Sequence, residues 1–189
     1  MILVRHGQSE FNRIFSETRI DPGIRDAGLT ALGQAQAEAV AAHLQASCRP
    51  TRLLASPYSR AIATARPIAR AFGLTIEVDP LVGEWVGFSC DIGSPRSQLV
   101  TSHPDIVFDH LEEVWWPAKE EETHVAARAN RFRNLQMGRQ DWRETVVVSH
   151  WGFLRALTGT AVQNGTVLRL DLDVDPPGGV EVVTLAQTC

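Results

Sequence analysis

The sequence lacks the features that define several protein classes. No stretch approaches the ~20 consecutive apolar residues of a transmembrane helix, and the first four residues, which run directly into Arg5, are too few for a signal peptide. The three cysteines, Cys48, Cys90 and Cys189, are few and widely spaced. This spacing indicates neither a disulfide framework nor a zinc site. We therefore expect a protein that needs no metal. Free thiols are typical of a reducing compartment, so we also expect it to be cytoplasmic.

Positive charge is also scarce. Eighteen Lys and Arg residues stand against 22 Asp and Glu residues, which gives a formal net charge of −4. This balance argues against binding to nucleic acid or to an anionic membrane, but it allows a local arginine cluster that binds a small anion. The G-x-x-x-x-G-K-[ST] loop is absent, which excludes a P-loop nucleotidase.

A chain of 189 residues, 44% of them hydrophobic, is typical of one globular domain, and we expect residues 1–189 to form it. The order of the expected elements is that of an α/β sandwich in which a terminal hairpin adds antiparallel strands to a mostly parallel sheet. Thr30 is the expected N-cap of the first helix, and Ser56-Pro57 reads as the N-cap and first residue of the second. The expected strands are 2–4, 53–55, 74–78, 145–149, 167–174 and 180–185, and the expected helices are 32–46, 58–72, 119–137 and 152–158.

Residues 79–117 are irregular and rich in glycine and proline. We expect one or two short helices there, within a segment that lies over the active site. Long irregular segments inside compact domains are uncommon unless they are functional.

Cationic and nucleophilic residues follow three of the expected strands. Arg5 and His6 come directly after the first strand, Arg60 follows the second, and His150 comes directly after strand 145–149. Ligands of open α/β sheets gather at the carboxyl ends of the strands. Arginine forks suit phosphate oxygens, and a neutral imidazole can attack phosphorus. These residue types predict phosphoryl transfer, which depends mainly on positioning and on charge stabilisation.

The reaction also needs a proton donor for the leaving oxygen. Glu84 is the candidate, because apolar neighbours would raise its pKa; Glu77, Glu112 and Glu113 are alternatives. The helix that begins near Gly152 would aim its first N–H groups at the phosphate that the arginines bind.

Four segments, in order, carry patterns that resemble the histidine phosphatase superfamily, also called the phosphoglycerate mutase-like family. Glu84 also stands where that family carries its acid/base carboxylate. The match extends over nearly the whole chain. The segments are 3–12 (LVRHGQSEFN), 28–37 (GLTALGQAQA), 56–65 (SPYSRAIATA) and 149–157 (SHWGFLRAL).

The resemblance implies roles for individual residues. His6 would be the phosphorylated nucleophile, Arg5, Arg60 and His150 would complete the phosphate pocket, and Asn12 would line it. The implied fold is a three-layer α/β/α sandwich, and the resemblance implies neither a cofactor nor a metal.

One position departs from the family pattern. The family usually has glycine directly after the second histidine, where this chain has Trp151. Its bulk predicts a substrate-binding wall that favours an apolar or planar leaving group. Trp85, Trp115 and Trp116 could belong to the same wall. For Trp115 and Trp116, core packing is the favoured reading and a lid is the alternative.

The resulting hypothesis is a phosphatase that hydrolyses a small phosphorylated metabolite through a phosphohistidine on His6. A phosphoglycerate mutase uses the same residues, but it needs longer insertions than this chain offers. A phosphohistidine phosphatase of phosphoproteins and a non-catalytic phosphate-binding module are the further alternatives. Neither the substrate nor the oligomeric state can be read from the sequence.

Overall fold

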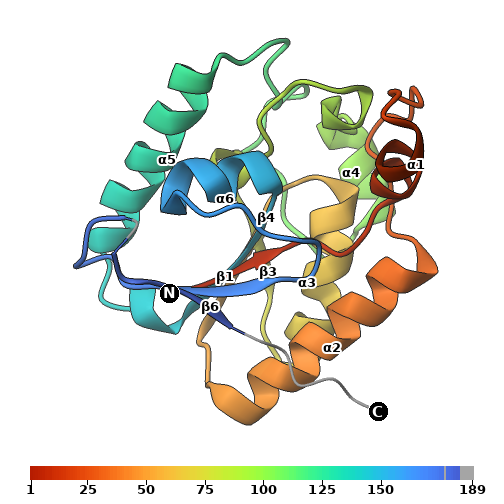
Figure 1. Cartoon of the computed structure of the whole chain (residues 1–189). Coiled ribbons are helices and arrows are strands. Elements are labelled where there is room, and N and C mark those ends of the chain that lie inside the picture. The colour runs from red at the N-terminus through yellow and green to blue at the C-terminus, as the bar shows by residue number, and fades with distance from the viewer. Residues whose placement is uncertain (177, 184–189) are drawn as a thin grey trace.

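The computed structural model describes residues 1–176 and 178–183 (Figure 1). Its strands are β1 (Ile2–Arg5), β2 (Arg52–Ala55), β3 (Ile76–Val78), β4 (Thr145–Ser149), β5 (Val167–Leu170) and β6 (Val180–Val183). Its α-helices are α1 (Glu10–Thr18), α2 (Ala31–Ser47), α3 (Ser59–Phe72), α4 (Arg96–Ser102), α5 (Glu122–Met137) and α6 (Trp151–Thr158). Three short 3-10 helices are η1 (Pro80–Val82), η2 (Ser89–Asp91) and η3 (Trp142–Glu144).

The strands form one sheet in the order β3-β2-β4-β1-β5-β6. The first four run parallel, whereas β5 is antiparallel to β1 and β6 is antiparallel to β5. The predicted mostly parallel sheet with an antiparallel terminal hairpin is therefore confirmed. The last two residues of the predicted strand 180–185, like Cys189, lie outside the described residues.

Alternating side chains of the central strands separate two helical layers. Ile2 and Val4 of β1 pack in one hydrophobic cluster with residues of α2 and α3. Leu3 points the other way and packs with residues of α5 and α6. Because successive side chains of a strand face opposite sides of a sheet, both faces of β1 are buried. Figure 1 shows the resulting three-layer α/β/α arrangement, with α2 and α3 on one side and α5 and α6 on the other.

The ends of the helices test the capping predictions. The Thr30 hydroxyl accepts a hydrogen bond from the Gly33 N–H, so Thr30 is the N-cap of α2 as predicted. The expectation that Ser56 caps the next helix is wrong, because α3 begins at Ser59 and Tyr58 precedes it without a side-chain cap. The Ser56 hydroxyl instead lies 2.8 Å from Nε2 of His150.

Two further differences concern the start of α5 and the presence of α1. α5 begins at Glu122 rather than at 119, and the buried Glu120 carboxylate accepts hydrogen bonds from Arg128 over 2.9 and 2.7 Å. α1 was not predicted at all. It begins with a reciprocal cap in which Ser9 and Asn12 each bond the other's backbone N–H.

The irregular segment 79–117 contains η1, η2 and α4, joined by turns. The chain leaves the sheet at the end of β3 and re-enters it at β4, after α5 and η3. Of the helices in the described part of the chain, none is long and apolar enough to cross a membrane.

Candidate active site

The register of the parallel strands brings three chain segments to one edge of the sheet. Arg5 pairs with Ser149 across β1 and β4, and Ala55 pairs with Val148 across β2 and β4. The residues that follow these strands are His6, His150 and Ser56, so all three lie at neighbouring strand ends. The backbone N–H of His6 donates to the Ser149 carbonyl over 3.0 Å, which extends the pairing by one step.

The His6 side chain is held in one tautomer. Its Nδ1 lies 2.7 Å from the Gly7 carbonyl oxygen. Because a carbonyl oxygen only accepts hydrogen bonds, Nδ1 carries the proton and Nε2 carries the lone pair. Burial, followed by the positive charges of Arg60 and Arg5, holds the pKa of His6 well below its usual value. Nε2 is therefore available as a nucleophile at neutral pH.

Close backbone packing fixes the loop after His6. A Cβ added at Gly7 would lie 2.3 Å from the Gly33 carbonyl oxygen, and one added at Gly33 would lie 2.0 Å from the Gln8 carbonyl oxygen. Both positions therefore require glycine. The Gly7 N–H donates to the Thr64 hydroxyl over 3.0 Å. The start of α2 and the buried side of α3 thus hold the loop from two sides.

His150 faces His6 at the same edge, with ring centroids 5.0 Å apart. Its Nε2 is paired with the Ser56 hydroxyl, whereas its Nδ1 is buried and has no hydrogen-bond partner among the described residues. Burial, with the positive charge of Arg60, lowers the pKa of His150 well below its usual value.

Like His150, Arg5 has one buried nitrogen without a partner in the described part of the chain. Its Nη1 donates to the Val162 carbonyl over 2.6 Å, while its Nε is buried and unpaired within the described part of the chain. Burial lowers the pKa of Arg5 to about 10, which leaves the side chain cationic at neutral pH. Buried polar atoms are rarely left without partners. An anion with several oxygens could accept from both Arg5 and His150.

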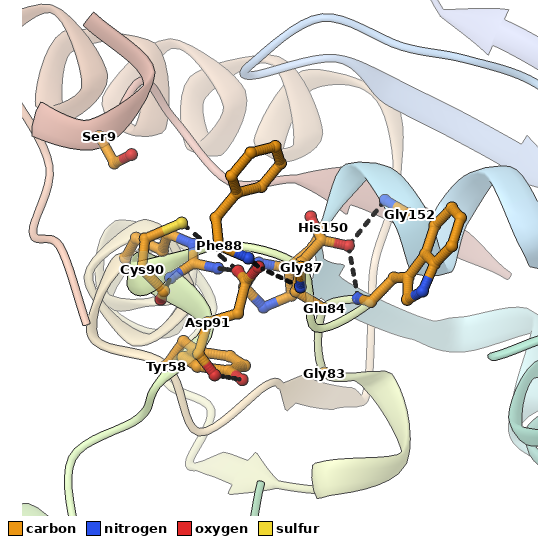
Figure 2. Close-up of polar contacts among 12 residues, drawn as sticks. Ser9, Tyr58, Gly83, Glu84, Gly87, Phe88, Cys90, Asp91, His150 and Gly152 are labelled. Atoms are coloured by element: carbon orange, nitrogen blue, oxygen red, sulfur yellow. Dashed lines mark hydrogen bonds and ion pairs between the residues drawn. The ribbon is translucent and has the colours of Figure 1, made fainter. Parts of the chain in front are cut away.

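Arg60 extends from the first turn of α3 and is 2% exposed. Its Nη1 donates to the Cys90 carbonyl over 2.8 Å, and its Nη2 lies 3.1 Å from Oδ1 of Asp91. The other Asp91 oxygen accepts from the N–H groups of Gly87 and Phe88 over 3.1 and 3.0 Å (Figure 2). η2 therefore holds the catalytic candidate Arg60 in place.

Glu84 lies against the start of α6. Its Oε1 accepts from the N–H groups of Trp85 and Gly152 over 2.8 and 2.7 Å (Figure 2). The first N–H groups of this helix were expected to point at the anion, but the Gly152 N–H donates to Glu84 instead. Burial, with the negative charge of Asp91, raises the pKa of Glu84. A protonated carboxyl at neutral pH is the state that a general acid requires.

All of these groups except His150 line one cavity of about 750 Å³. The sequence-predicted residues in its wall are Arg5, His6, Asn12, Arg60, Glu84 and Trp151. His150 is not among the lining residues, but its ring centroid lies 5.0 Å from that of His6. Of the four tryptophans considered, Trp85 and Trp151 line the cavity, whereas Trp115 and Trp116 do not. The alternative carboxylates Glu77, Glu112 and Glu113 also lie outside the lining.

Asn164 belongs to the site but was not predicted. Its Nδ2 donates to the His6 carbonyl over 3.1 Å and to Oδ1 of Asn12 over 3.0 Å. Asn12 itself lines the cavity and also takes part in the cap of α1. Asn164 lies in a loop without periodicity, and no local sequence signal identifies it.

Known proteins resemble this chain in sequence and in fold. A family model described as the histidine phosphatase superfamily (branch 1) matches residues 1–187. The chain belongs to the histidine phosphatase superfamily. One curated superfamily relative is the bifunctional protein Rv2228c of Mycobacterium tuberculosis, which is 29% identical over 92% of this chain and 48% of its own length. The chain thus spans about half the length of that relative.

Two further matches cover more of the other protein. The glucosyl-3-phosphoglycerate phosphatase of Mycolicibacterium vanbaalenii is 29% identical over 89% of this chain and 78% of its own length. A solved structure named mycobacterial hydrolase 1 has a TM-score of 0.62 at 23% identity and covers 89% of each chain. The structural match shows that the two proteins share the fold.

Proposed function

We propose that the chain hydrolyses a small phosphomonoester through a phosphohistidine formed on His6. The observation that carries this proposal is the fixed tautomer of His6, whose Nδ1 donates to Gly7 and whose Nε2 holds a lone pair beside Arg5 and His150. Membership of the superfamily and relatives named as phosphatases support the same assignment.

In the first step, Nε2 of His6 attacks phosphorus and the bond from phosphorus to the ester oxygen breaks. Arg5 Nε and His150 Nδ1, which have no partner among the described residues, are the donors for the equatorial oxygens, and Arg60 adds a positive charge nearby. Such donors stabilise the charge that spreads over the transferring group. Glu84 gives its proton to the leaving oxygen, so the alcohol departs neutral.

In the second step, water attacks the phosphorus of phosphohistidine. Glu84, now a carboxylate, takes a proton from this water, and the bond from phosphorus to Nε2 breaks. Inorganic phosphate leaves, and both His6 and Glu84 return to their starting protonation states. One carboxyl thus serves as acid and then as base.

A panel of phosphorylated metabolites, scored by release of inorganic phosphate, tests the proposal. Activity on several esters that is lost in His6→Ala is the expected result, and the assay in excess EDTA tests the expectation that no metal is needed. If 3-phosphoglycerate yields 2-phosphoglycerate rather than phosphate, the protein is a mutase. Phosphate binding without any turnover would favour a non-catalytic module.

A cytoplasmic location stays a prediction.

A further inference from the structure

Three phenylalanines form a continuous apolar surface in the same cavity as the catalytic groups. Phe11, Phe15 and Phe88, here called the phenylalanine shelf, all line it. Their ring centroids lie 5.3 Å apart for Phe11 and Phe15, 5.4 Å for Phe11 and Phe88, and 4.9 Å for Phe15 and Phe88. Each ring thus contacts the other two at a separation typical of aromatic pairs.

The backbone places each ring of the shelf. Phe11 and Phe15 are four residues apart on α1, so they share one helical face. Phe88 comes from the distant irregular segment and caps η2, where its N–H donates to Asp91. Figure 2 shows its side chain pointing away from Asp91. The same contact that holds the Arg60 network therefore also orients the shelf.

The shelf is incompletely covered by protein. Phe11 is buried, Phe15 is half-buried, and Phe88 is 44% exposed. Single exposed apolar side chains are ordinary on protein surfaces. Three touching rings are not an isolated exposure, since they line the same cavity as His6.

Two tryptophans extend the apolar lining, one with a hydrogen bond from its indole N–H and the other with a cation–π contact. The Trp85 indole N–H donates to the Glu120 carbonyl over 2.9 Å. The Arg155 guanidinium lies 5.3 Å from the centre of the Trp151 ring. Preorganised aromatic walls with a few placed polar groups are typical of sites for small organic ligands.

The size of the cavity also exceeds what a phosphoryl group needs. About 750 Å³ falls within the range of sites that enclose whole organic molecules. The catalytic groups lie in the part of the cavity that contains His6, so a phosphoryl group fits there. The remaining part, beside the shelf, receives the alcohol portion of the ester.

We propose that the alcohol portion of the substrate is apolar and planar, such as an aromatic alcohol, and that it binds on the phenylalanine shelf. This inference rests on the proposed phosphatase function. The reaction is balanced without any co-reactant: water and the phosphomonoester give inorganic phosphate and the free aromatic alcohol.

Two esters with leaving groups of similar basicity test the proposal. We compare 2-phenylethyl phosphate with 2-hydroxyethyl phosphate, because neither alcohol is chemically activated. Burial of one phenyl ring predicts a kcat/KM roughly 10- to 100-fold higher for the phenylethyl ester, mostly through a lower KM. A ratio near one, or a preference for a polar ester such as 3-phosphoglycerate, would overturn the inference.

Substitutions locate the preference on the shelf. Phe88→Ala and Phe15→Ala are expected to reduce the ratio of the two kcat/KM values by about tenfold, and Phe88→Leu is expected to restore part of it. Leu135→Ala, which removes an exposed apolar side chain of α5 outside the cavity, is the control and should leave the ratio unchanged. A ratio that both shelf variants retain would contradict the assignment.

A binding measurement separates this inference from the proposed function. The non-hydrolysable 3-phenylpropylphosphonate should bind roughly 10- to 100-fold more tightly than propylphosphonate, whether or not the protein turns over any ester. Equal affinities would overturn the shelf assignment. Turnover without aromatic preference removes only the shelf, whereas aromatic preference in binding without turnover of any ester removes the phosphatase.

Discussion

Nη2 of Arg60 lies 3.1 Å from Oδ1 of Asp91, and both side chains are 2% exposed. The Tyr58 hydroxyl donates to the Asp91 carbonyl over 2.6 Å, and the Arg60 guanidinium lies 4.5 Å from the centre of the Tyr58 ring. This buried ion pair joins α3 to η2. It connects a phosphate-binding candidate to the irregular segment that lines the rest of the cavity.

Asp91→Asn should destabilise the fold. The substitution leaves the Arg60 cation buried without its counter-charge, which typically costs about 3–5 kcal/mol of unfolding free energy. Denaturant unfolding at neutral pH measures the loss. Glu38→Gln is the control, because its ion pair with Arg70 is solvent-exposed and should contribute at most ~1 kcal/mol. Equal, small losses in the two variants would contradict the importance of the buried pair.

The same substitution should change the pH profile. Burial and the Asp91 charge both raise the pKa of Glu84, and the mechanism needs Glu84 protonated. Activity therefore falls as pH rises through the pKa of Glu84. In Asp91→Asn that pKa is lower, so the basic limb of kcat/KM should move to lower pH. Measuring both proteins with one substrate cancels the titration of the substrate, and an unmoved or upward-moving limb would show that Asp91 does not influence the acid.

Glu84→Gln tests the proton donor. Glutamine can still accept hydrogen bonds from Trp85 and Gly152, but it cannot donate a proton to the leaving oxygen. We expect alkyl phosphates to slow by about 10²- to 10⁴-fold, while p-nitrophenyl phosphate, whose leaving group needs little protonation, slows far less. Steady-state kinetics on both esters measures the difference. Equal slowing would remove Glu84 from this role.

Gly152→Ala tests the contact that positions Glu84. An added Cβ would lie 2.6 Å from Oε1 of Glu84 and 2.7 Å from Cβ of Trp85, so the carboxyl must move. Misplacement of a catalytic group by about 1 Å can cost about 10² in rate. The control is Gly28→Ala, because a Cβ there meets no atom within 4 Å. Full activity in Gly152→Ala would mean that this hydrogen bond does not place the acid.

Much of the fold was predictable because β-branched runs such as 145–149 indicate buried strands. The strands in turn indicate where His6 and His150 emerge. The pairing of Ser56 with His150 was not predictable, since Ser56-Pro57 is also an ordinary helix start and the two partners are far apart in sequence. Asp91 and Asn164 were missed for the same reason, because each acts through a contact with a distant segment.

The phenylalanine shelf was only half visible in the sequence. Phe11 and Phe15 have helical spacing, but α1, the helix that carries both, was not predicted. Phe88 reaches them only after the irregular segment folds back. Of the tryptophans, Trp85 and Trp151 line the cavity, whereas Trp115 follows the core-packing alternative. Trp115 packs on Tyr58 with ring centroids 4.7 Å apart and donates to the Ser94 carbonyl, so its neighbourhood is structural rather than part of the cavity.

The central claim is that His6 carries the phosphoryl group during turnover. The most direct test is to quench the reaction with alkali within a single turnover, since phosphohistidine survives alkali, and to map the phosphorylated peptide by mass spectrometry. A phosphoryl group on His6 that disappears as phosphate forms, and that is absent in His6→Ala, is the predicted result. Turnover without any phosphorylated His6, or undiminished turnover in His6→Ala, would contradict it.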